Sequence, residues 1–209
     1  MESATRIRVC SVDHQALVRE GIATIINAEP DMLVVAQAST GRDAIQMFRE
    51  HRPDVTLLDL DLGETCGLDV LTAIRTEFSD ARVIVVTTAG GDADIQHALE
   101  AGACGYLLKS CPAKELIAAI RQVHAGQRHV TPEAAARLAE HVGDRYLSDR
   151  EVEVLQQVAG GNRNRDIAVQ LFITEETVKM HLKNIMEKLG ASDRTQAVAI
   201  AVRRGFLHL

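Results

Sequence analysis

The chain has 209 residues, a length that suits two small domains better than one. Its net charge of −6 argues against binding to a polyanion over the whole surface, and no run of eighteen apolar residues is present to span a membrane. Because the N-terminus lacks a basic region followed by a long apolar stretch, we expect no secretory signal and a cytoplasmic protein.

The first 125 residues alternate between strand-like and helix-like segments. Short apolar runs predict five strands, at Ile7–Val12, Leu33–Ala38, Val55–Leu58, Arg82–Thr87 and Cys104–Leu108. Amphipathic stretches predict a helix after each strand, at Leu17–Asn27, Gly41–Glu50, Leu68–Glu77, Ala93–Ala101 and Lys114–His124. This alternation predicts an α/β domain over residues 1–125, with a doubly wound, flavodoxin-like sheet of five parallel strands covered on both faces.

The rest of the chain shows no strand pattern. Residues 126–146 are predicted to form a linker with a short helix that starts near Thr131. Residues 147–209 predict a small all-α domain of four helices, at Asp149–Ala159, Arg163–Leu171, Glu175–Leu189 and Arg194–Arg204.

Charged residues are also distributed differently between the predicted α/β domain and the predicted helical domain. Residues 1–125 carry 11 Lys and Arg against 18 Asp and Glu, whereas residues 161–209 carry 8 against 5. An acidic first half and a mildly basic tail predict two domains with different partners.

Chemically active side chains stand at the ends of the predicted strands. Asp13 and His14 follow the first strand, Asp59 the third and Lys109 the fifth, and Thr87 ends the fourth. Because the carboxyl ends of parallel strands meet at one edge of a sheet, these groups should converge. A carboxylate beside a hydroxyl, a lysine and a metal is suited to phosphoryl transfer, with the carboxylate as acceptor.

The same residues also permit an enzymatic interpretation. The apolar strand that ends in Asp59-Leu60-Asp61 is similar to the nucleophile motif of haloacid-dehalogenase-type phosphatases. In those enzymes the motif usually ends the first strand, whereas here two strands precede it. We therefore expect a protein that is not an enzyme.

Residues 6–125 resemble the receiver domain of a two-component response regulator. The segments that carry the resemblance are IRVCSVDHQALVREG, PDVTLLDLDL, ARVIVVTT and GACGYLLKS. The resemblance implies that Asp59 accepts a phosphoryl group, that Lys109 pairs with it, and that Thr87 and Tyr106 are the switch residues. It further implies Mg2+ held by Asp13, Asp59 and Asp61, and a sensor histidine kinase as partner.

One residue of the acidic pocket departs from the family. Family members usually carry two acidic residues after the first strand, and here the pair is Asp13-His14. Since Mg2+ prefers oxygen ligands, an imidazole is a poor replacement for the missing carboxylate. Two hypotheses follow: either Asp59 is phosphorylated weakly or not at all, or His14 is tolerated and the site works as usual.

The predicted helix Glu175–Leu189 has one apolar face and one polar face. Val178, Leu182, Ile185, Met186 and Leu189 form a stripe at helical spacing. Thr174 can cap the helix, and Lys179 and Lys183 lie together away from the stripe. The pair could be no more than a solvated surface, but an exposed lysine face after a short helix and a tight turn is typical of a helix-turn-helix entering the major groove.

The last sixty residues are similar to the LuxR-type helix-turn-helix, from LSDREVEVLQQ to AVAIAVRRG, and with the receiver they resemble the NarL/FixJ subfamily of response regulators. The resemblance implies binding to double-stranded promoter DNA as a homodimer paired through Ala197, Val198 and Ala201. It implies base contacts from Lys179, Met180 and Lys183, and phosphate contacts from Thr174, Thr177, His181, Asn164 and Arg165. The alternative is an adaptor whose receiver binds a protein or small ligand, independently of phosphorylation and with DNA binding secondary.

Overall fold

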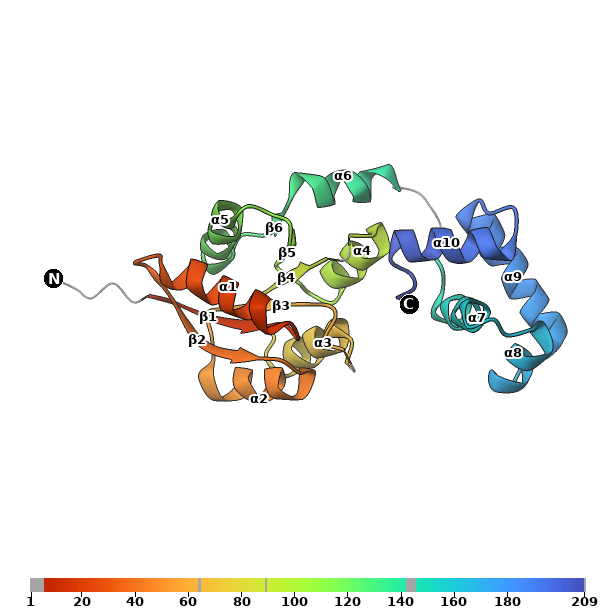
Figure 1. The fold of residues 1–209 in the computed structure, drawn as a ribbon, viewed down its shortest axis with the longest axis horizontal. Helices are drawn as coiled ribbons and strands as arrows, with labels where there is room; N and C mark the ends of the chain where they lie inside the picture. The colour runs from red at the N-terminus through yellow and green to blue at the C-terminus, as the bar shows by residue number, and fades with distance from the viewer. Residues whose placement is uncertain (1–5, 64, 89, 142–145, 209) are drawn as a thin grey trace. The chain divides into compact units, whose positions relative to one another are not determined.

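The computed structural model describes residues 6–63, 65–88, 90–141 and 146–208, which fall into two compact units (Figure 1). The first unit comprises residues 1–89 and 95–136, and the second comprises residues 90–94 and 137–209. Among the described residues, no helix combines the length and the hydropathy that crossing a bilayer requires.

A parallel sheet of six strands forms the centre of the first unit. Its strands are β1 (Ile7–Val12), β2 (Met32–Ala38), β3 (Val55–Leu58), β4 (Val83–Thr87), β5 (Gly105–Leu108) and β6 (His129–Val130). Their order is β2-β1-β3-β4-β5-β6, and every pair is parallel. The predicted fold class is confirmed, but the sheet has one strand more than the five expected. The sixth, β6, pairs with β5 through Gly105 and His129, inside the segment predicted as a linker.

Five helices alternate with the first five strands, as predicted. They are α1 (Ala16–Asn27), α2 (Gly41–His51), α3 (Gly67–Glu77), α4 (Asp92–Glu100) and α5 (Ala113–His124). Helices α1 and α5 cover one face of the sheet, and α2 and α3 cover the other (Figure 1). Every residue of β3 is buried, including Thr56, which explains why the strand carries no charged residue in the sequence.

The helix expected near Thr131 is α6 (Pro132–Glu140). Thr131 is buried, and its hydroxyl accepts a hydrogen bond from the backbone N–H of Ala134 at 3.2 Å. Thr131 therefore satisfies one of the free N–H groups at the start of this helix.

The second unit contains α7 (Asp149–Ala159), α8 (Asn164–Gln170), α9 (Glu175–Leu189) and α10 (Arg194–Arg204), as predicted to within one residue at either end. Side chains cap three of them: Ser148 caps α7, Thr174 caps α9 and Asp193 caps α10. The core is formed by apolar residues from all four helices, among them Leu155, Ile167, Val178, Leu182, Ile185 and Ala197.

Packing of α10 corrects one expectation. Ala197 and Ala201 are fully buried in the hydrophobic core of the second unit, and Val198 packs against that core. The side chains of Ala197 and Ala201 therefore stabilise the fold of the unit and are not presented on its surface as a dimer contact, whereas a contact through the half-buried Val198 stays a prediction.

A buried ion pair also lies within the second unit. Lys188 of α9 donates to Glu151 of α7 at 2.6 Å and to the backbone carbonyl of Tyr146 at 3.1 Å. Glu151 is 4% exposed and also accepts hydrogen bonds from the N–H and hydroxyl of Ser148. Hydrogen bonds from Lys188 and Ser148 outweigh the effect of burial, which alone would raise the pKa of Glu151, and hold that pKa below its ordinary value.

Candidate functional site

The carboxyl edge of the sheet brings four of the predicted residues together. Asp13 follows β1 and Asp59 follows the neighbouring strand β3, while Thr87 ends β4 and Lys109 follows β5. The ammonium group of Lys109 lies 2.7 Å from Oδ2 of Asp13 and 2.7 Å from Oδ2 of Asp59. The backbone N–H of Lys109 donates to the carbonyl of Thr87 at 2.8 Å, which aligns the ends of β4 and β5.

These groups are largely shielded from solvent. Asp13 and Asp59 are each 2% exposed, and Thr87 and Tyr106 are buried as well. Burial alone would lower the pKa of Lys109, but its hydrogen bonds to the two carboxylates outweigh that effect and raise the pKa. Lys109 therefore stays protonated and offsets part of the negative charge of the pair.

His14 lies beside the two carboxylates and is partly exposed. Its Nδ1 atom lies 2.7 Å from the backbone carbonyl oxygen of Asp61 and 3.7 Å from Oδ2 of Asp59. A carbonyl oxygen can only accept, so Nδ1 carries the hydrogen of this bond. The imidazole thus holds the loop after β3 against the strand end that carries Asp59.

Asp61 contacts the pocket through its backbone carbonyl, and its side chain does not take part. Its carboxylate is exposed and accepts a hydrogen bond from the N–H of Gly63 at 3.0 Å, within its own loop. The side chains whose ligand atoms come together, all within 4.8 Å, are Asp13, His14 and Asp59. The predicted metal ligands Asp13 and Asp59 are therefore adjacent, while the side chain of Asp61 lies outside this group.

The donor set does not match the preference of magnesium. One oxygen of Asp59, Oδ1, is buried and accepts no hydrogen bond among the described residues. Mg2+, however, requires near-octahedral oxygen coordination at about 2.1 Å. Here the third side chain offers a nitrogen, and its N–H already holds the carbonyl of Asp61.

Gly67 is a site residue that the sequence interpretation missed. A Cβ atom at this position would lie 2.2 Å from the carbonyl oxygen of Asp59, closer than atoms can approach. Its N–H donates to the carbonyl of Leu60 at 2.7 Å. Only glycine lets α3 begin this close to the strand end that carries Asp59, and a lone glycine in the sequence does not announce such a contact.

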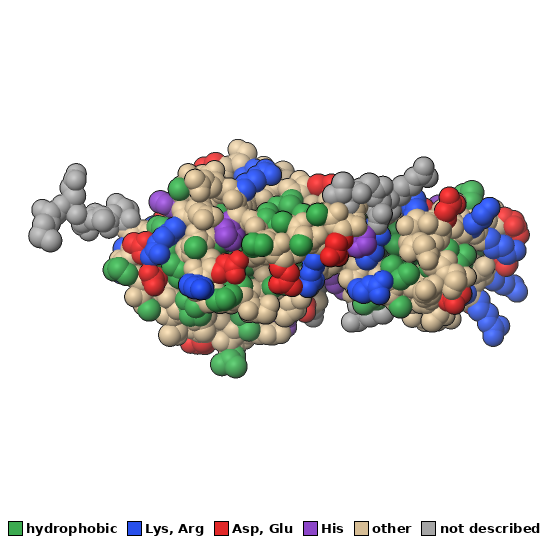
Figure 2. Space-filling model, turned by 90° about the horizontal axis from the view of Figure 1, so that it is seen from above, with side chains coloured by type: hydrophobic (Ala, Val, Ile, Leu, Met, Phe, Trp, Pro, Cys, Tyr) green, Lys and Arg blue, Asp and Glu red, His purple; other side chains and the backbone are tan. Residues whose placement is uncertain are grey.

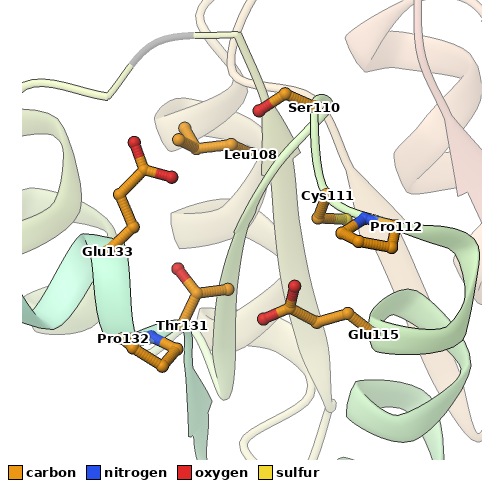
Figure 3. Close-up of a pocket in the computed structure, with 8 residues that line it drawn as sticks. All are labelled: Leu108, Ser110, Cys111, Pro112, Glu115, Thr131, Pro132 and Glu133. Carbon is orange, nitrogen blue, oxygen red and sulfur yellow. The ribbon is translucent and has the colours of Figure 1, made fainter.

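A separate cavity of about 340 Å³ lies between the β5–α5 loop and the start of α6 (Figure 3). Its lining residues are Leu108, Ser110, Cys111, Pro112, Glu115, Thr131, Pro132 and Glu133. Glu115 extends into it from α5 and Glu133 from α6 (Figure 3). None of the strand-end carboxylates lines this cavity, so it is distinct from the pocket around Asp59.

In the second unit, α9 presents the polar face that the sequence predicts. Its apolar stripe is buried, whereas Lys179 and Met180 are about half exposed and Lys183 is exposed. Thr174 accepts a hydrogen bond from the N–H of Thr177 at 3.1 Å and so caps the helix. Figure 2 shows Lys and Arg side chains projecting from the part of this unit that carries α8 and α9, with acidic side chains among them.

The remaining predicted DNA contacts belong to α8, α9 and the cap of α9, and they differ in exposure. His181 and Thr177 are half-buried, as is Asn164 at the start of α8, while Arg165 and Thr174 are exposed. The structure therefore places the exposed members where a large ligand can reach them.

Acidic neighbours already engage one of the lysines. Lys179 donates to Glu176 at 2.9 Å and lies 3.9 Å from Glu175, and the hydrogen bond to Glu176 raises the pKa of Lys179. The raised pKa favours the charged form of Lys179, and its ammonium group lies beside the first turn of α9. Binding of a polyanion to this face must replace these two carboxylates as partners of Lys179.

Comparisons with known proteins agree with both halves of the chain. Residues 9–121 match the family described as response regulator receiver domain, and residues 145–201 match bacterial regulatory proteins, luxR family. The transcriptional regulatory protein LiaR of Bacillus subtilis (strain 168) is 38% identical over 205 residues, which cover 94% of this chain and 97% of the relative.

Two solved structures extend the comparison. The response regulator ChrA of a heme-sensing two-component system is 37% identical with a TM-score of 0.58, covering 97% of this chain and 99% of that chain. RcsB of Salmonella enterica serovar Typhimurium, bound to promoter P1flhDC in the presence of the phosphomimetic BeF3−, is 25% identical with a TM-score of 0.72, covering 94% of this chain and 98% of that chain.

Proposed function

Because the chain belongs to the response regulators that join a receiver domain to a LuxR-type DNA-binding domain, we propose that it reads promoter DNA with α9 and regulates this reading through the pocket around Asp59. One observation carries the first part: a capped helix whose apolar stripe is buried leaves Lys179, Met180 and Lys183 exposed on one face. Lysine at such a face donates to guanine O6 and N7 in the major groove.

The neighbouring polar groups hold the helix in register on the duplex. We propose phosphate contacts from Thr174, which caps α9, from Thr177 and His181 on α9, and from Asn164 and Arg165 on α8. Such contacts orient a reading helix without carrying sequence information. We place the protein in the cytoplasm, since a promoter reader must work where the DNA is, and propose that it binds as a homodimer on paired half-sites.

Selection from a random duplex library tests this function. The full-length chain should enrich a defined motif and bind it at least a hundredfold more tightly than a scrambled duplex at the same salt concentration. Equal affinity for the enriched and scrambled duplexes would reject a sequence-specific reader. A chain that keeps its cellular function without any promoter binding would favour the adaptor alternative.

The receiver pocket supports phosphoryl transfer to Asp59. The unpaired Oδ1 attacks the phosphorus atom of the donor, for which we propose a phosphohistidine of a sensor kinase, and the bond from phosphorus to the histidine nitrogen breaks with its electron pair on that nitrogen. Lys109 contacts Oδ2 and is placed to offset the added charge. Receiver domains generally bind Mg2+ in such a pocket.

We predict that this transfer is slow because His14 replaces an oxygen ligand. Incubation with acetyl phosphate and Mg2+ should leave most of the wild-type chain unmodified by intact mass, whereas His14→Asp should accelerate addition to Asp59 at least tenfold. Rapid stoichiometric phosphorylation of the wild-type chain would contradict the prediction. Asp59→Asn is the control for the site of addition.

A further inference from the structure

The cavity between the β5–α5 loop and the start of α6 takes no part in the function proposed above, and we propose that it binds a small organic cation with an ammonium or guanidinium group. Glu115 is the counter-ion of this ligand, and the walls of the cavity hold its short apolar body. The site is separate from the pocket around Asp59 and from α9, so it depends neither on phosphorylation nor on DNA binding.

The size and the walls of the cavity suit a small molecule. Its volume of about 340 Å³ lies in the range of pockets that bind small ligands. Leu108, Pro112 and Pro132 supply apolar surface, and the half-buried Cys111 packs against the hydrophobic core of the first unit. A body of a few carbon atoms can therefore be withdrawn from water between the loop and α6.

Glu115 brings a carboxylate without a partner into this cavity. The residue lies in the first turn of α5, is half-buried and extends into the open space (Figure 3). Its carboxylate forms no ion pair and accepts no hydrogen bond within the described part of the chain. Because a partly buried charge without a partner is costly, a cation that pairs with Glu115 gains more than it would at an exposed carboxylate.

The other charged and ionisable groups of the lining favour a cation as well. Glu133 reaches the cavity from the first turn of α6, and none of the eight lining residues is basic (Figure 3). Burial raises the pKa of the Cys111 thiol, and the negative charge of Glu115 raises it further. The thiol therefore stays neutral, and the charges that disfavour a thiolate here favour a positively charged ligand.

The spacing of the acidic groups favours an organic cation over a metal ion. A metal requires ligand atoms that converge on a point about 2 Å from each of them. Cys111, Glu115 and Glu133 do not bring their ligand atoms within 4.8 Å of one another, whereas another group among the described residues does. A guanidinium or ammonium group instead needs a single carboxylate, to which a guanidinium can donate two parallel hydrogen bonds.

A pair of probes that differ in charge tests the proposal. Butylguanidinium chloride and butylurea have the same apolar chain and a planar head group, but only the first is a cation. Each is titrated at constant ionic strength into isotope-labelled full-length protein, and backbone amide signals are recorded by NMR. The wild type is compared with Glu115→Gln and with Glu20→Gln, which makes the same chemical change at an exposed position of α1 outside the cavity.

We expect butylguanidinium to shift the signals of Ser110, Cys111, Glu115 and Thr131 until they saturate. Butylurea should bind the wild type at least about tenfold more weakly, and Glu115→Gln should weaken the binding of butylguanidinium by a similar factor. Glu20→Gln should bind like the wild type. Equal affinity for the two probes, unchanged affinity in Glu115→Gln, or shifts confined to residues away from the cavity would overturn the proposal.

Discussion

Replacing Glu151 by glutamine should lower the free energy of unfolding of the second unit by about 2–4 kcal/mol. Lys188 would keep its charge in a partly buried place without a carboxylate to offset it, and this is the usual reason why breaking a buried ion pair is costly. Glutamine at this position can still complete the capping box with Ser148, so the loss isolates the ion pair from the helix cap.

Glu153 provides the matched control on the same helix. It accepts a hydrogen bond from Arg150 at 2.6 Å, but both side chains of this pair are exposed. Glu153→Gln should therefore change stability by less than about 0.5 kcal/mol. Urea denaturation of the full-length variants, followed by circular dichroism of the helical signal, gives both values, and equal losses for the two substitutions would refute the importance of the buried pair.

The same ion pair predicts a dependence on acid. The folded chain holds the pKa of Glu151 below its ordinary value of 4.5, so folding favours the ionised form. The stabilisation is complete above that ordinary value and is lost as the pH falls through the lower pKa of the folded state. Stability of the wild type should fall more steeply below about pH 4.5 than that of Glu151→Gln, in which this group no longer titrates.

Replacing both Lys179 and Lys183 by alanine should reduce binding to the selected DNA by a hundredfold or more. A lysine that contacts a base edge typically contributes about tenfold to hundredfold in affinity for the correct sequence. Both side chains lie on the exposed face of α9, so their removal leaves the buried stripe intact. Gel-shift titrations on the selected and scrambled duplexes should show the larger loss on the selected one.

The double variant Lys114→Ala/Arg203→Ala is the control for charge. Both residues are exposed and lie on other helices, α5 and α10, so the net charge changes equally. If the two double variants lose affinity equally, α9 contributes only nonspecific attraction. Circular dichroism of both variants verifies that the fold is retained.

Much of the fold follows from the sequence because each element carries its own periodicity. The apolar run Val55–Leu58 predicts a strand buried on both faces, and all four residues are buried. The stripe from Val178 to Leu189 predicts the buried face of α9 in the same way. β6 was missed because two residues are too few to show a period, and its existence depends on pairing with β5.

The sequence predicts which residues of the site gather at the strand ends, but not the contacts that they make there. Parallel topology alone brings Asp13, Asp59 and Lys109 to one edge, which is why they were identified. The bond from His14 to the carbonyl of Asp61 joins residues 47 apart in sequence, and no local pattern contains it. The sequence correctly predicted that Lys179 and Lys183 are exposed. It did not predict the ion pair between Lys179 and Glu176, because a spacing of three residues permits such a pair without requiring it.

The two-residue strand β6 anchors the start of α6 to the sheet. Val130 pairs with Tyr106, and the N–H of Thr131 donates to the carbonyl of Tyr106 at 3.5 Å. Thr131 in turn caps α6, so the backbone of the proposed switch residue and the first turn of the outgoing helix share one residue. A displacement of β5 at Tyr106 would therefore move Thr131, and with it the first turn of α6.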